Sequence, residues 1–167
     1  PLPPAPPVTP PPPPPPGPNF ECYSEDPYLP ARLAVGFVRG VQSVGVGTTV
    51  KHFVANDSEF ERMTISSDVD EAVLRELYLV PFEAAVREGG AWGIMSAYNR
   101  VNGTYCSEHE WLLTTVLRDE WGFDGFVISD WFGTHSTAPA ANAGLDLEMP
   151  GPPQWFGRSL VDAVTNG

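Results

Sequence analysis

The sequence is poor in positive charge. Lysine occurs once, at Lys51, and only nine of the 167 residues are basic, whereas 21 are acidic, so the formal net charge is −12. Proteins that hold nucleic acid present clustered Lys and Arg side chains to the phosphate backbone. This sequence contains no such cluster, and we therefore expect no nucleic-acid partner.

Cysteine and long apolar runs are also scarce. The two cysteines, Cys22 and Cys106, lie far apart and form no C-x-x-C pair, so the sequence predicts neither a metal site nor a disulfide framework. No cofactor is expected. No run of 18 apolar residues occurs, which argues against a membrane-spanning helix.

Proline is distributed unevenly. Thirteen of the 20 prolines precede Asn19, in the run PLPPAPPVTPPPPPPPGP, which has few side chains to bury and few amide donors. Residues 1–18 are therefore predicted to be disordered or to form extended polyproline II. We interpret them as a linker or as the product of a damaged gene model, and a ligand for a proline-binding domain is the less favoured alternative. Residues 19–167 are interpreted as one partial domain.

Strand-like and helix-like patterns alternate after residue 19. Short apolar and β-branched runs predict strands at 48–53, 93–98 and 125–131, with a fourth strand-like run at 144–149. Amphipathic stretches predict helices at 24–43, 68–90 and 107–122, and the start of another at 158–167.

The first predicted helix has a candidate start and a candidate buried face. Ser24 is of the residue type that favours the N-cap position, and Pro27 would lie in the first turn. Leu33, Phe37 and Val41 recur at a spacing of four and would form the face turned toward the core.

The next two helices carry break and start signals of their own. Pro81 is expected to kink the second helix, and Gly89 with Gly90 is expected to end it. Ser107, followed three residues later by Glu110, predicts a capping box at the start of the third helix.

The alternation predicts an α/β fold with a parallel sheet, because repeated strand–helix units join parallel strands through right-handed crossovers. An open doubly wound sheet and a (β/α)₈ barrel of the TIM type both fit. No G-x-G-x-x-G or G-x-x-x-x-G-K-[ST] follows a predicted strand, so the barrel is favoured over nucleotide-binding open sheets. A complete barrel needs about 250 residues. The prediction is therefore an incomplete barrel, roughly its second half.

Polar side chains end every predicted strand. In a parallel barrel, catalytic groups lie at the carboxyl ends of the strands, where side chains leave the packed interior. The strongest candidate is Asp130, because Trp131 follows it. An indole beside a carboxylate suits a sugar site: the indole offers an apolar face on which the ring can stack, and the carboxylate places an anion beside the anomeric carbon. The strand-end candidates are Lys51, His52, Tyr98, Asp130, Asp146 and Glu148.

Five segments, in order, carry a family resemblance. NFECYSEDPYL, VKHFVANDSEFER, IMSAYNRVNG, WGFDGFVISDW and GLDLEMPG together resemble the N-terminal barrel domain of glycoside hydrolase family 3, in its β-glucosidase-like branch. The branch that cleaves N-acetylglucosamine typically has KHFPGHG where this sequence has KHFVAND, so that branch is disfavoured. The resemblance covers nearly all of residues 19–167.

The resemblance implies a retaining glycosidase. It makes Asp130 the nucleophile, which would form a covalent glycosyl-enzyme that water then hydrolyses. Lys51 and His52 match a pair that binds sugar hydroxyls, and the lysine would also favour the charged form of the nucleophile.

The remaining implied contacts surround that nucleophile. Tyr98 matches a tyrosine that contacts the nucleophile region, Met95 matches a methionine lining the sugar pocket, and Trp131 matches the platform of the sugar subsite. Glu59 and Arg62 match a polar cluster that we expect to shape the loop after the KHF strand. A small carbohydrate is thus the expected substrate.

The departures from the family pattern suggest a fragment. The first part of the barrel is missing, Pro18 stands where the family usually has an arginine, and the general acid/base is expected from an absent C-terminal domain. The complete protein is interpreted as an exo-acting β-glycosidase that removes terminal β-linked sugars. The isolated chain is expected to be inactive, since general acid catalysis contributes about 10²- to 10⁴-fold.

Two other functions stay open on the sequence. The chain could be a catalytically inactive sugar-binding or structural remnant of the same domain. It could also be a lyase or aldolase that forms a Schiff base through Lys51, although such a lysine prefers an apolar pocket and this one adjoins His52.

Overall fold

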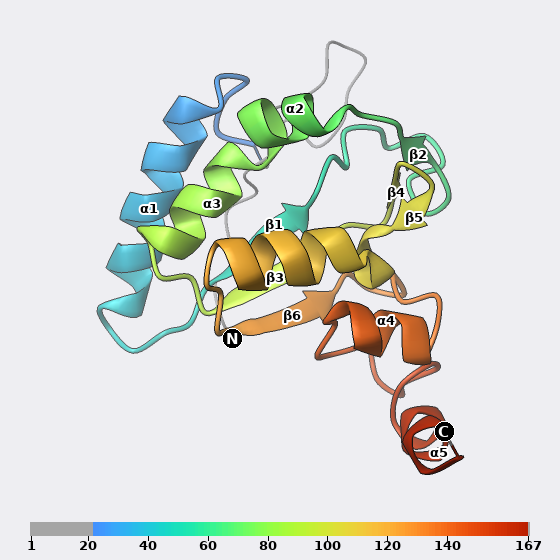
Figure 1. Ribbon diagram of the computed structural model, residues 1–167. Coiled ribbons are helices and arrows are strands. Elements are labelled where there is room, and N and C mark those ends of the chain that lie inside the picture. Colours follow the sequence, from blue (N-terminus) through green and yellow to red (C-terminus); the bar gives the residue numbers. More distant parts are fainter. Residues whose placement is uncertain (1–21, 167) are drawn as a thin grey trace.

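The structure, a computed structural model, describes residues 22–166 (Figure 1). The predictions for residues 1–18 lie outside this part of the chain. Strands β1 (Thr49–Phe53), β3 (Gly93–Ser96) and β6 (Phe126–Ser129) form one sheet in the order β1-β3-β6. Both strand pairs are parallel. The predicted parallel α/β arrangement and its first three strands are therefore confirmed.

The fourth strand-like run is a correction, because it contributes one bridge and no strand. Leu147 forms an isolated parallel bridge with Ile128, and the Ser129 N–H donates to the Leu147 carbonyl at 2.9 Å. The Val127 N–H instead donates to the side chain of Asp146, at 2.7 Å from Oδ2. A carboxylate thus takes the position that a backbone carbonyl would need for the ladder to continue.

Helix α1 (Tyr28–Gln42) packs on α3 (Val80–Arg87), but through a different face from the one predicted. Leu33 and Phe37 are 43% and 36% exposed. Small side chains dominate the buried face, and they allow the two helices to approach closely. The residues of that face are Pro30, Ala31, Ala34, Val35 and Val38.

The start of α1 also differs from the prediction. The N-cap position belongs to Pro27, and the N–H of Tyr28 donates to the Asp26 carboxylate at 2.9 Å. The Ser24 hydroxyl accepts the N–H of Asp26 at 3.1 Å, in the segment that precedes the helix. Ser24 therefore orders the approach to the helix and does not cap it.

The second predicted helix is interrupted, as its proline indicates. It comprises α2 (Glu71–Val73), a π-helical segment η2 (Leu74–Tyr78) and α3. The N–H of Leu79 donates to the carbonyl of Leu74, five residues earlier, at 2.8 Å. Pro81 lies in the first turn of α3, where its missing N–H costs least. The kink near Pro81 is confirmed.

Side chains of α1 bind the carboxyl end of α3. That helix ends at Arg87, and Gly90 has a φ of 69°, a left-handed conformation that favours glycine. Arg39 donates to the carbonyl of Glu88 at 2.8 and 3.0 Å, and Gln42 donates to the carbonyl of Gly90 at 2.8 Å. These bonds satisfy backbone acceptors that a helix end leaves unpaired.

The third helix begins without the predicted capping box. It is π-helical, η4 (Trp111–Glu120), and Ser107 lies before it in a buried 3₁₀ turn. Glu110 occupies the N-cap position and makes no side-chain cap bond. The N–H of Leu112 instead donates to Nδ1 of His109 at 3.4 Å.

A second sheet was not predicted. It contains β2 (Ser66–Ser67), β4 (Arg100–Val101) and β5 (Thr104–Tyr105), with β4 between the other two. The β4–β5 hairpin turns at Asn102 and Gly103, whose φ values of 50° and 89° match a two-residue hairpin turn. The Asn-Gly pair was the one signal of this hairpin in the sequence.

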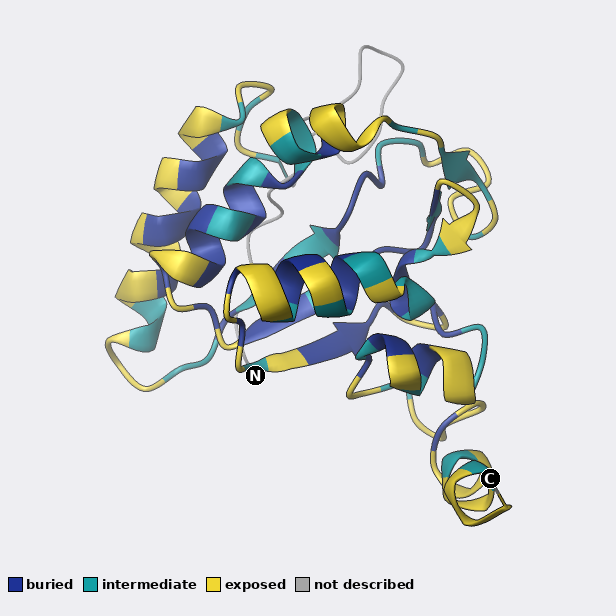
Figure 2. Ribbon diagram, in the orientation of Figure 1, coloured by how far each residue is buried: buried dark blue, intermediate teal, exposed yellow. Residues whose placement is uncertain are grey.

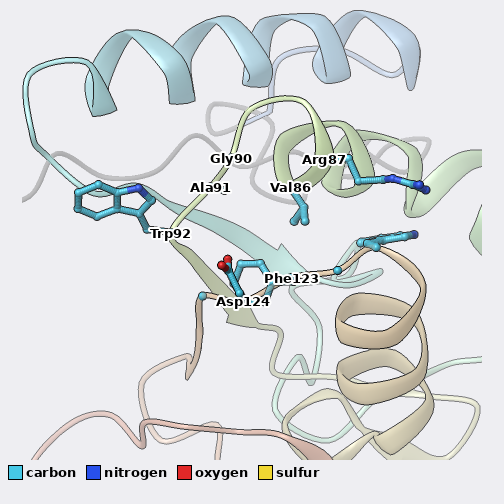
Figure 3. Close-up of a pocket in the computed structure, with 10 residues that line it drawn as sticks. Val86, Arg87, Gly90, Ala91, Trp92, Phe123 and Asp124 are labelled. Atoms are coloured by element: carbon cyan, nitrogen blue, oxygen red, sulfur yellow. The ribbon is translucent and has the colours of Figure 1, made fainter.

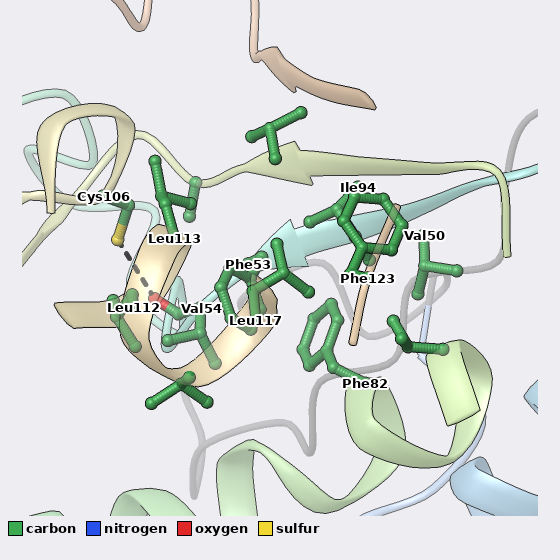
Figure 4. Close-up of a cluster of buried hydrophobic side chains, with 14 of the residues drawn as sticks. Val50, Phe53, Val54, Phe82, Ile94, Cys106, Leu112, Leu113, Leu117 and Phe123 are labelled. Atoms are coloured by element: carbon green, nitrogen blue, oxygen red, sulfur yellow. Dashed lines mark hydrogen bonds between the residues drawn. The ribbon is translucent and has the colours of Figure 1, made fainter. Parts of the chain in front are cut away.

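The core lies between the parallel sheet and the helices that cover it (Figure 2). Phe53 from β1 meets Phe82 from α3 edge to face, with ring centroids 5.1 Å apart. Leu117 from η4 and Ile94 from β3 belong to the same buried cluster (Figure 4). Burying Phe53 alone contributes about 1.5–3 kcal/mol.

The remaining elements of residues 22–166 are η3 (Cys106–Glu108), α4 (Ala138–Ala143) and α5 (Arg158–Asn166). The helix predicted at 158–167 is confirmed as α5. None of its residues is buried, and it lies beyond α4 at the end of the described chain (Figure 1). Among the helices of residues 22–166, none has the length and apolar character that a membrane crossing requires.

Candidate active site

Three polar side chains meet where the parallel strands end. His52 lies in β1, Tyr98 follows β3 by two residues, and Asp130 comes directly after β6. Because the strands are parallel, their carboxyl ends lie at the same edge of the sheet. The three side chains therefore come together although they are distant in sequence.

Asp130 is the centre of this group and is only 8% exposed. Its Oδ2 lies 3.2 Å from Nε2 of His52. Its Oδ1 accepts the backbone N–H of Trp131 at 2.7 Å. These two contacts hold the orientation of the carboxylate at the strand end.

Tyr98 contacts the same carboxylate. Burial, followed by the negative charge of Asp130 and a hydrogen bond to it, raises the pKa of Tyr98 to about 12. The phenol is therefore neutral at physiological pH and can donate a hydrogen bond to the carboxylate.

Arg62 is the residue whose place in the site was not foreseen. Its guanidinium lies 4.9 Å from the centroid of the Tyr98 ring and pairs with Glu59 at 2.9 Å. The sequence had assigned Glu59 and Arg62 to a cluster shaping the loop after β1. That loop also brings a cation to the face of a site tyrosine, which is a favourable cation–π geometry.

The other predicted site residues lie near this group. Lys51 precedes His52 in β1 and is half-buried. Met95 in β3 pairs with Ile128 in β6, and its side chain is also half-buried. Trp131 is 57% exposed, so its indole lies open at the edge of the site.

Two strand-end acids serve the backbone. Asp146 accepts bonds from the N–H of Val127 and from Arg118, each at 2.7 Å. Glu148 accepts the N–H groups of three consecutive residues of the following loop: Gln154, Trp155 and Phe156. Within residues 22–166, no three His, Cys, Asp or Glu side chains gather in a way that could hold a metal ion.

A cavity of about 390 Å³ lies at the other end of the strands (Figure 3). Trp92 immediately precedes β3, and Phe123 and Asp124 shortly precede β6, so the cavity opens at the amino ends of these strands. It is therefore separate from the Asp130 group. A second cavity, of about 310 Å³, lies between α1 and α3.

The pattern of residues 12–167 matches the family model described as the glycosyl hydrolase family 3 N terminal domain. The chain belongs to this family. The resemblance found in the sequence is thereby confirmed, and the residues of the Asp130 group lie within the matched region.

Individual relatives agree with this membership. A β-glucosidase of Rhizobium radiobacter is 66% identical over 151 residues, which cover 90% of this chain and 18% of the relative. Among solved structures, the β-glucosidase of Kluyveromyces marxianus in complex with glucose is 51% identical, with a TM-score of 0.84, over 86% of this chain and 17% of that one. β-Glucosidase 3B of Thermotoga neapolitana in complex with glucose is 48% identical, with a TM-score of 0.84, over 89% and 22%.

The chain therefore spans about a fifth of the length of these relatives.

Proposed function

We propose that this chain is part of a retaining, exo-acting β-glycosidase that hydrolyses terminal β-linked sugars from oligosaccharides or glycosides. The observation that carries the proposal is the buried Asp130 carboxylate, held between His52 and the Trp131 amide. Relatives named β-glucosidase, two of them solved with glucose, support a small sugar as the substrate.

In the proposed reaction, the Asp130 carboxylate attacks the anomeric carbon while the glycosidic C–O bond breaks. The departing oxygen takes a proton from a general acid. Water then attacks the same carbon, transfers a proton to that group and releases the sugar, so two inversions give net retention.

The neighbouring residues have distinct proposed roles. The Trp131 N–H and His52 orient the carboxylate, and neutral Tyr98 stabilises its charged form by donating a hydrogen bond. The exposed indole of Trp131 offers a flat apolar surface for a sugar ring. Lys51 is assigned to sugar hydroxyls, and Met95 to the wall of the pocket.

The general acid and the rest of the barrel belong to other parts of the protein in this proposal. The parallel sheet of residues 22–166 contains three strands, whereas a closed barrel of this type has eight. A C-terminal domain is proposed to supply the acid/base group. The isolated chain is accordingly proposed to be inactive toward unactivated glycosides.

A segment swap tests this function. The matched 151-residue segment of the Rhizobium radiobacter β-glucosidase would be replaced by that of this chain. The segment-swapped enzyme should hydrolyse a nitrophenyl β-glucoside, and proton NMR should detect β-glucose as the first product. Asp130→Asn in the swapped enzyme should lose this activity, and Asp162→Asn, which changes an exposed carboxylate, is its matched control.

Two outcomes would overturn the proposal in different ways. First release of α-glucose would contradict the retaining mechanism. A folded swapped enzyme that binds glucose without turnover would favour the alternative, an inactive sugar-binding remnant. Membership of the glycosidase family removes the support for a Schiff-base lyase, and absence of a borohydride-trapped adduct on Lys51 would confirm its exclusion.

A further inference from the structure

The β4–β5 hairpin contacts the loop that follows the candidate nucleophile. The ring of Tyr105, in β5, stacks on the imidazole of His135 with centroids 3.6 Å apart and planes 16° from parallel. Arg100, in β4, places its guanidinium 4.3 Å from the same Tyr105 centroid and donates to the Tyr105 hydroxyl at 2.9 Å. The tyrosine thus joins a cation of the hairpin to an imidazole of the loop.

A second contact fixes the neighbouring residue. The Ser136 hydroxyl donates to the carboxylate of Glu108, in the 3₁₀ turn that follows β5. The same hydroxyl oxygen accepts the N–H of Ala140 at 3.2 Å. His135 and Ser136 together attach the carboxyl half of the loop to residues 105–108.

The amino half of the loop belongs to the candidate site. Asp130 and Trp131 begin it, and the Gly133 N–H donates to the Asp130 carbonyl at 2.9 Å. A Cβ at Gly133 would come within 3.4 Å of the Tyr98 ring, so this turn packs closely on the site tyrosine. Only Thr134, which is buried, separates Gly133 from His135. Displacement of His135 would therefore move backbone that lies against Tyr98 and Asp130.

The charge state of His135 suits stacking. Burial lowers its pKa, Glu108 from η3 opposes that shift, and Arg100 from β4 adds to it. The neutral imidazole can stack on Tyr105 beside Arg100. An imidazolium would place a second positive charge close to that guanidinium in a partly desolvated position.

We propose that His135 is a positioning residue: through its stack on Tyr105, it holds the loop that carries Asp130 and Trp131 in the geometry for sugar binding and attack. This rests on the proposed glycosidase function. The hairpin acts through His135 and does not touch the sugar in this account.

Kinetics of the segment-swapped enzyme test the catalytic part. His135→Ala should lower kcat/KM about tenfold, with KM raised and kcat lowered, since an aromatic stack contributes on the order of one tenfold factor. His135→Phe keeps the stack and should restore kcat/KM to within about twofold of the parent. Tyr105→Phe keeps the aromatic ring and should lower kcat/KM only slightly, whereas Tyr105→Leu removes the ring and should lower kcat/KM about as much as His135→Ala does.

The pH profile separates positioning from loss of folded enzyme. The parent should lose activity on the acid side as His135 becomes protonated, and His135→Phe should shift that acid limb to lower pH. A purely structural role would lower the active fraction and leave KM and the acid limb unchanged. Unchanged kcat/KM in His135→Ala, or equal damage in His135→Phe, would overturn the proposal.

A readout without catalysis distinguishes this proposal from the proposed function. In this chain labelled with 5-fluorotryptophan, the ¹⁹F resonance of Trp131, assigned with Trp131→Phe, should shift in His135→Ala and return in His135→Phe. An unmoved resonance would overturn the positioning role. If the resonance shifts but the swapped enzyme without any substitution is inactive, the positioning role of His135 is supported and only the glycosidase function is contradicted.

Discussion

Nε2 of His52 lies 3.2 Å from Oδ2 of Asp130, although their strands, β1 and β6, are separated in the sheet by β3. Strands two apart in a flat sheet are about 9.5 Å from each other. The short contact therefore means that the two side chains reach toward each other across the end of β3. In TIM barrels, inward-facing layers are built from alternate strands, and this contact has that arrangement.

Tyr98 should titrate late and depend on Asp130. Its pKa is raised from 10.0 to about 12, first by burial and then by the charge of Asp130. Ultraviolet titration should show a late tyrosine component that loses the amplitude of one tyrosine in Tyr98→Phe, while Tyr78, whose pKa is also raised by burial and by Asp57, continues to contribute to it. Asp130→Asn should shift this ionisation to lower pH, and an unchanged late component in Tyr98→Phe would contradict the assignment.

The same shift predicts the sign of an alkaline effect on stability. Because the folded-state pKa of Tyr98 is raised, its contribution is fully present below pH 10.0 and is lost as pH rises to about 12. The free energy of unfolding should therefore fall less steeply over this window in Tyr98→Phe. Urea denaturation at several pH values measures it, and parallel curves for the two proteins would contradict it.

His109, and not Ser107, should matter for the start of η4. Nδ1 of His109 accepts the N–H of Leu112, so His109→Ala should cost about 1 kcal/mol of unfolding free energy, the usual cost of removing a side-chain acceptor at the start of a helix. His109→Asn should recover most of it. Ser107→Ala is the matched control and should be near neutral, because the Ser107 hydroxyl makes no hydrogen bond among the described residues.

His109 also predicts an acid effect. Burial lowers its pKa below the ordinary 6.5, so its contribution is present above pH 6.5 and declines as pH falls through the folded-state value. Protonation also removes the acceptor for the Leu112 N–H. Urea midpoints measured from pH 7 downward should decline less in His109→Asn, and identical declines would exclude this role.

Two glycines should respond in opposite directions to alanine. A Cβ at Gly125 would lie 2.2 Å from the Trp92 carbonyl oxygen, so Gly125→Ala should lower the free energy of unfolding by about 1–3 kcal/mol. At Gly36, inside α1, nothing lies within 4 Å of the added atom, and Gly36→Ala should raise stability by about 0.5–1 kcal/mol. Denaturant midpoints that move together would contradict this packing.

The strands and the candidate nucleophile were predictable because their signals are local and strong. The apolar run before Asp130 predicts a buried strand, and the abrupt change to polar residues marks its end. The family resemblance then supplied roles for His52 and Tyr98. The contacts that join them to Asp130 depend on which strands lie side by side in the sheet, which periodicity alone does not encode.

Other features escaped prediction for identifiable reasons. The face of α1 was misjudged because Leu33 and Phe37 are larger and more apolar than the alanines that permit close packing on α3. The start of η4 was misjudged because the side chain that accepts an N–H of its first turn belongs to His109, and histidine is outside the usual set of capping residues. Strands of two residues, as in β4 and β5, are too short for a periodic signal, and only the turn at Asn102 and Gly103 indicated them.

The roles of Asp146 and Glu148 required coordinates. Any carboxylate at a strand end can face a ligand or satisfy nearby backbone N–H groups, and these two do the latter. In the sequence they alternate with Leu145, Leu147 and Met149, a pattern that does not show whether the carboxylates face a ligand or the backbone. What distinguishes Asp130 is its burial beside His52 and Tyr98.

The central claim is that Asp130 is the nucleophile, and covalent labelling tests it most directly. The segment-swapped enzyme would be treated with an activated 2-deoxy-2-fluoro-β-glucoside, and its peptides would be analysed by mass spectrometry. We expect the label on Asp130, and we expect Asp130→Asn to retain glucose binding while turnover falls by several orders of magnitude, because the attacking charge is lost and the shape is kept. A label on Asp124, Asp146 or Glu148, or normal turnover in Asp130→Asn, would contradict the account.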